Sequence, residues 1–91
     1  MATEVQLPEN MTIHYIETHF GEINKAFNEA DNEIVINANK LETIDTSGLQ
    51  SLLTLIKYAA EQQKQVSWQD TPEVLEQGAE KIGLSQALQL N

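Results

Sequence analysis

The chain has 91 residues, of which 41% are hydrophobic and 21% charged, a composition ordinary for one soluble globular domain. It contains no cysteine, which excludes disulfides, thiolate metal sites and cysteine nucleophiles. Fourteen acidic residues against five basic ones give a net charge of −9, which opposes nucleic-acid binding. This charge either maintains solubility alone or favours binding of a neutral or basic protein partner.

The N-terminal stretch MATEVQLPENM has neither the basic nor the apolar region of a signal peptide. The apolar runs of the chain are too short to cross a membrane. We therefore expect one cytoplasmic domain over residues 1–91, without membrane insertion.

The first half of the chain predicts two short strands, a helix and a longer strand. Residues 4–7 alternate polar and apolar side chains, as in an edge strand, and residues 11–13 predict a second short strand. Apolar residues recur every three or four positions over 16–30, which predicts an amphipathic helix. The run EIVINA, residues 33–38, predicts a central strand buried on both faces, although Asn37 interrupts its apolar character.

The second half predicts a helix over 46–63, a strand over 65–69, a third helix after Pro72 and a short helical piece over 84–88. Aspartate and threonine directly before Pro72 are typical of a helix cap. The inner face of the third helix is assigned to Val74, Leu75, Gly78, Ala79 and Ile82.

Strands that alternate with helices indicate parallel pairing through right-handed crossovers. The predicted fold class is α/β, with a small mixed, largely parallel four-stranded sheet and three to four helices. We expect the helices to cover one face of this sheet more fully than the other.

The motif IDTSGL, residues 44–49, stands between the central strand and the second helix. Asp45, Thr46 and Ser47 are all residue types that cap helices, so capping is the simplest structural interpretation. Gly48 lowers helix stability by about 0.5–1 kcal/mol relative to alanine, and a cap does not need it. A glycine here gives another backbone or an active site room to approach the Ser47 hydroxyl.

A phosphate at this helix start would meet free backbone N–H groups and the positive end of the helix dipole. Its charge of about −1.5 to −2 would lie beside Asp45 in an acidic protein. We therefore expect phosphorylation to disrupt an interface more readily than the fold.

With these residues the sequence resembles the STAS domain family, the bacterial anti-sigma-factor antagonists. The family hallmark is a hydrophobic residue, Asp, two hydroxyl residues, Gly and an aliphatic residue, which Ile44 to Leu49 match. The resemblance covers nearly the whole chain, through EIVINANKLETID, SLLTLIKYAAEQQKQVSW and PEVLEQGAEKIGLSQALQL.

The resemblance implies that Ser47 is the phosphoacceptor, Asp45 its acidic neighbour and Thr46 the second hydroxyl. It also implies a partner-binding surface formed by Asp45, Thr46, Ser47, Gly48 and Leu49. The unphosphorylated form would bind an anti-sigma-factor serine kinase, or a related signalling partner, and relieve its inhibition of the sigma factor. The kinase would release the antagonist by phosphorylating it with ATP, and a phosphatase would reset the cycle.

Two departures from the family pattern leave the subfamily open. Asn37 stands where the family often has aspartate, and no glycine precedes the strand at Val66. Other members serve chemotaxis or signalling clusters, and some are non-phosphorylated subunits of lipid-transport ABC complexes, in which the motif contacts the ATPase.

An enzyme ranks last among the alternatives. The chain has no G-x-S-x-G elbow to make a serine nucleophile, and nothing singles out a catalytic base. His14 and His19 are five positions apart and would not share a helix face, so no metal is expected. We expect no catalytic residue and no cofactor.

Overall fold

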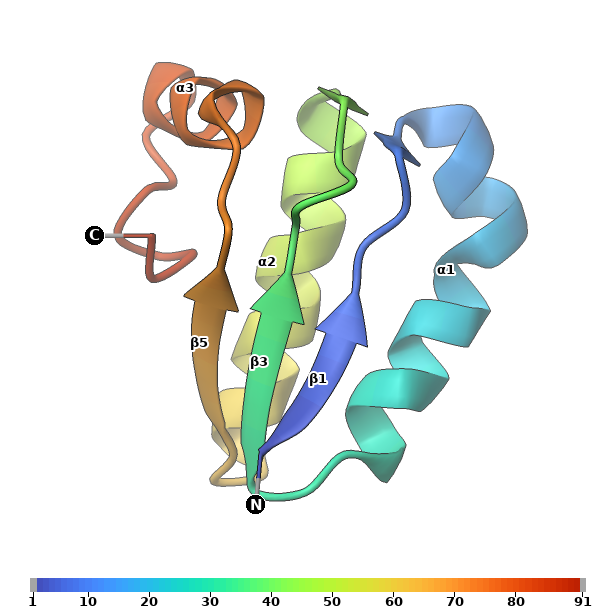
Figure 1. Ribbon diagram of the computed structural model, residues 1–91, viewed down its shortest axis with the longest axis vertical. Helices are drawn as coiled ribbons and strands as arrows, with labels where there is room; N and C mark the ends of the chain where they lie inside the picture. Colours follow the sequence, from blue (N-terminus) through green and yellow to red (C-terminus); the bar gives the residue numbers. More distant parts are fainter. Residues whose placement is uncertain (1, 91) are drawn as a thin grey trace.

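The computed structural model describes residues 2–90 and contains three helices and five short strands (Figure 1). In chain order the elements are β1 (Thr3–Gln6), β2 (Asn10–Met11), α1 (Ile13–Glu29), β3 (Glu33–Asn37), β4 (Thr43–Ile44), α2 (Thr46–Glu61), β5 (Gln65–Gln69) and α3 (Glu73–Lys81). The predicted α/β class is confirmed.

The strands form two small parallel sheets. β3 is the centre of a main sheet with the order β1-β3-β5, and β2 pairs separately with β4. The prediction of largely parallel strands is confirmed, but they do not join into one four-stranded sheet. The N–H group of Leu7 still donates to the Asn37 carbonyl at 2.9 Å, and Pro8, which has no N–H to donate, then ends the pairing. β2 therefore lies beyond the end of the main sheet (Figure 1).

The helices leave one face of the main sheet open. In Figure 1, α2 lies behind the sheet, α1 lies alongside β1, and no helix lies in front. Val5, Ile34 and Ile36 belong to the buried core. The alternate side chains of the strands are mainly polar and include Glu4, Gln6, Asn37, Ser67 and Gln69. The prediction that residues 33–38 form a strand buried on both faces holds on the face of Ile34 and Ile36, whereas on the second face Asn37 is buried and Val35 is only half-buried.

Asn37 is buried by neighbouring polar groups, with only 5% of its surface exposed. Its side-chain amide donates to the Glu4 carboxylate, and its Oδ1 accepts from the Asn39 N–H at 2.9 Å. The Gln6 side chain also donates to the Asn37 carbonyl at 3.1 Å. These bonds explain how a central strand accommodates an asparagine, because a buried amide is tolerated when its donors and acceptors are satisfied.

Two predictions near the C-terminus are wrong. Residues 85–89 form turns instead of a short helix, because positive φ angles at Gly83 (73°) and Gln89 (62°) leave too few residues between them for a stable helix. The segment is held instead by Leu88, whose carbonyl accepts from the Trp68 indole at 2.7 Å. The cap position of α3 is Pro72 and not the aspartate or threonine before it.

The lysine directly before β5 caps the end of α1. The last turn of α1 contains no basic residue, but Lys64 Nζ donates to the carbonyls of Phe27 at 2.9 Å and Asn28 at 3.1 Å. Carbonyls at a helix end lack intrahelical partners and lie at the negative end of the helix dipole. The lysine therefore ties the first helix to the start of the last strand.

We expect Lys64→Met to lower the free energy of unfolding by about 1 kcal/mol, because methionine keeps the apolar stem but leaves both carbonyls without their charged donor. Urea denaturation measures this loss. The control is Lys57→Met at an exposed position of α2, which should change stability by less than about 0.5 kcal/mol. An equal loss in both variants would show that the cap contributes nothing.

Candidate partner-binding site at the start of α2

Asp45 fixes the starts of two helices. It is the cap residue of α2, where its Oδ1 accepts from the Gly48 N–H at 2.9 Å. Its Oδ2 accepts from the N–H of Ile13, the first residue of α1, at 3.0 Å. The predicted capping role is confirmed, and the carboxylate also joins the two helix N-termini.

Gly48 is required by the chain's own backbone. A β-carbon at Gly48 would lie 2.0 Å from the Met11 carbonyl oxygen and 2.8 Å from Ile44 Cγ1. Of the two predicted uses of this space, a close approach by another backbone is observed, and that backbone is the chain's own Met11, so an active site cannot use the same space. Strand β2 fills that space, so the glycine allows β2 to pack against the start of α2.

Of the two hydroxyls in the motif, that of Thr46 lies on the more exposed residue. Thr46 is exposed, Ser47 is half-buried, and neither hydroxyl forms a hydrogen bond with another residue in the range 2–90. Both residues lie in the first turn of α2, where backbone N–H groups have no intrahelical acceptor. Gly48 and Leu49 are buried, so a partner reaches the motif mainly through Asp45, Thr46 and Ser47.

A groove of about 360 Å³ separates the start of α2 from α3. Leu49 contributes to the lining of the groove from α2. Gly78 lines it from α3, and a β-carbon added at Gly78 would lie 3.4 Å from Leu49 Cδ1. The remaining lining residues are Ile44, Asp45, Thr46, Val74, Gln77, Lys81 and Ile82. The motif thus forms one wall of a partly apolar groove.

Exposed apolar side chains flank the motif on both sides. Val74 and Ile82, on the α3 side, are 36% and 38% exposed, and Ile13 at the start of α1 is 46% exposed. The prediction that Val74 and Ile82 lie on the inner face of the third helix is therefore wrong, whereas Leu75 and Ala79 are buried as expected. Val74 and Ile82 line the same groove, and neighbouring exposed apolar side chains of this kind are typical of a protein-binding site.

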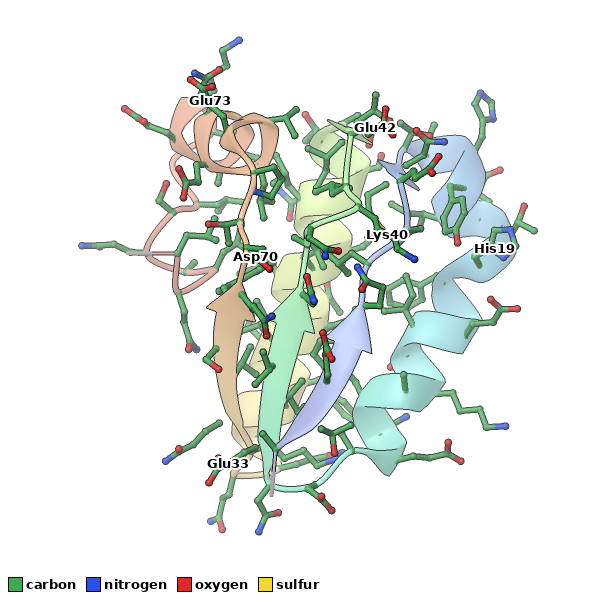
Figure 2. The ribbon with its side chains drawn as sticks, viewed as in Figure 1. His19, Glu33, Lys40, Glu42, Asp70 and Glu73 are labelled. Carbon is green, nitrogen blue, oxygen red and sulfur yellow. The ribbon has the colours of Figure 1, made fainter. Side chains whose placement is uncertain are left out.

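Acidic residues lie at the same end of the molecule. Figure 2 shows Glu42 and Glu73 at the end where α2 begins, and both are exposed. Lys81 is the single basic residue in the lining of the groove. In a chain with a net charge of −9, this surface suits a neutral or basic partner better than an acidic one.

His19 contacts two residues of its own helix. His19 Nδ1 lies 3.4 Å from Glu22 Oε2, and the ring of His19 packs against that of Tyr15 with centroids 4.2 Å apart. Between residues 2 and 90 the structure contains no group of three or more potential metal ligands. Over the same residues, no helix has the length and apolar character needed to cross a membrane.

Comparisons with protein-family models, with curated proteins and with solved structures gave no match for this chain. The structure supports a small α/β domain with parallel strands and a hydroxyl motif at the start of α2.

Proposed function

We propose that this chain is a STAS-like protein-binding module whose affinity for a signalling partner is switched by phosphorylation at the start of α2. The observation that carries the proposal is the pair of Thr46 and Ser47 hydroxyls, free of hydrogen bonds within residues 2–90, beside a groove bordered by exposed Val74 and Ile82. The unphosphorylated form would bind an anti-sigma-factor serine kinase, or a related signalling protein, and relieve its inhibition.

The geometry supports a switch that acts on binding. Asp45 and Gly48 hold the local structure through contacts that do not use either hydroxyl. A phosphate here would add negative charge to an acidic surface that is already bordered by apolar side chains. Such a group opposes the burial of that surface against a partner while leaving the core of the domain unchanged.

The choice between the two hydroxyls is part of the proposal. The resemblance to the STAS family implied Ser47 as the acceptor. The greater exposure of Thr46 favours Thr46, because a kinase must bring the hydroxyl into its own active site. Both positions therefore need to be tested separately.

The test is purification of the protein with its bound partners from its native cell, followed by peptide mapping of the modification site. If Thr46 is the acceptor, Thr46→Val should abolish phosphate incorporation by the co-purified kinase, and if Ser47 is the acceptor, Ser47→Ala should do so. Aspartate at the acceptor position should weaken binding of the partner at least about tenfold. The other single variant serves as the matched control.

Retention of phosphorylation in the Thr46→Val/Ser47→Ala double variant would overturn the site. Stable co-purification of an unmodified chain with a transporter ATPase would favour the alternative, a STAS subunit of a lipid-transport complex.

A further inference from the structure

The main sheet has two edges, of which the β1 edge is open to a further strand. On the β5 side, residues 84–90 lie beside the carboxyl end of the strand and are tied to it by the bond from Trp68 to the Leu88 carbonyl (Figure 1). On the other side, β1 is the last strand in the order β1-β3-β5, so no strand formed by residues 2–90 pairs with its outer edge. β1 contains neither proline nor lysine, which commonly protect exposed edges, and its one charged residue is Glu4.

The open edge presents backbone groups of Glu4 and Gln6. The Leu7 N–H donates to Asn37 of β3, so the backbone of Leu7 points inward. Because the backbone groups of successive strand residues alternate in direction, those of Val5 also point toward β3, and those of Glu4 and Gln6 point away from it. The edge therefore offers N–H and C=O groups at strand spacing.

A cleft of about 440 Å³ runs between this edge and α1. Its lining includes the consecutive residues 4–8, together with Ile23 and Ala26 from α1. Ile23 is buried and Ala26 is packed against the core, so they form an apolar floor. The charged residues of the lining are Glu4, Glu22 and Lys40, of which two are acidic.

We propose that the edge of β1 binds an extended segment of a partner protein, which adds a fourth strand to the main sheet and alternates basic with apolar side chains. An extended backbone is the ligand that matches a row of free strand N–H and C=O groups. Its apolar side chains would lie over Ile23 and Ala26, and its basic ones beside Glu4 on the open face. A second copy is disfavoured because each chain has a net charge of −9.

This binding edge is separate from the proposed switch. The cleft and the groove at the start of α2 share no lining residue. A partner held at β1 would remain bound whether or not the hydroxyl motif is phosphorylated.

The experiment is a titration of the full, ¹⁵N-labelled chain with a blocked peptide in which lysine alternates with valine. We expect the largest chemical-shift changes and slowed amide exchange at Glu4 and Gln6. The same peptide N-methylated at alternate positions should bind about tenfold more weakly, because it cannot donate to the edge. A peptide with glutamate in place of lysine should also bind more weakly, because it would face Glu4.

A matched pair of variants tests the edge from the protein side. Gln6→Pro removes the outward N–H together with the side chain, whereas Gln6→Ala removes the side chain alone, so only Gln6→Pro should abolish binding. If Gln6→Pro does not fold, the N-methylated peptide gives the same test on the unaltered chain. No binding at about 1 mM peptide, or equal binding of the N-methylated peptide, would overturn the proposal. Self-association that Gln6→Pro abolishes would instead assign the edge to a second copy.

Discussion

Gly48→Ala is expected to lower the free energy of unfolding by at least about 3 kcal/mol, a large part of the total stability of a small domain. The added β-carbon would lie 2.0 Å from the Met11 carbonyl oxygen, which is backbone and cannot rotate away. Relief requires a shift of β2 or of the start of α2, and Asp45 holds both α1 and α2 at that point. Urea denaturation with circular dichroism measures the loss.

Two other glycines provide controls for this variant. Gly21 is exposed within α1 and a β-carbon there meets nothing within 4 Å, so Gly21→Ala should raise stability by about 0.5–1 kcal/mol. At Gly78 the nearest contact would be 3.4 Å, from the side chain of Leu49, so Gly78→Ala should be far milder than Gly48→Ala. Similar stabilities for Gly48→Ala and Gly78→Ala would contradict the role given to β2.

Apolar periodicity was sufficient to predict the longer elements. The helix expected over 46–63 is observed as Thr46–Glu61, and the strand expected over 65–69 has the predicted bounds. β4 was missed because two residues carry no periodic pattern, and its position depends on long-range bonds such as that from the Glu42 N–H to the Glu9 carbonyl at 2.7 Å. Such bonds cannot be inferred from the spacing of side chains.

The motif predicted the position of the candidate site but not its supports. The capping role of Asp45 followed from its place before a helix, whereas its bond to Ile13 spans 32 residues of sequence. The need for glycine at position 48 could not be predicted for the same reason, because the backbone that it contacts, that of Met11, lies in a strand distant in the sequence. Apolar spacing also assigned Val74 and Ile82 to the covered face of α3, since periodicity does not reveal how wide an arc a neighbouring element covers.

Neighbouring residues of the motif thus have different tasks. Asp45 and Gly48 position the start of α2 through contacts within the chain, and Thr46 and Ser47 keep their hydroxyls free of such contacts among residues 2–90. Variants of the first pair should therefore change stability, and variants of the second pair should change binding. This separation allows the proposed switch to be tested without confusing it with unfolding.

Asp45→Ala is expected to lower the free energy of unfolding by about 2 kcal/mol, because it removes the acceptors of the Gly48 and Ile13 N–H groups together. The diagnostic measurement is amide hydrogen exchange, which should accelerate in the first turns of both α1 and α2, although only α2 follows Asp45 in the chain. Asp31→Ala, at an exposed position between α1 and β3, is the matched control and should leave both helix starts protected. Acceleration confined to α2 would reduce Asp45 to an ordinary cap, and the two helix starts would then have to be held together by the packing of β2 against Gly48.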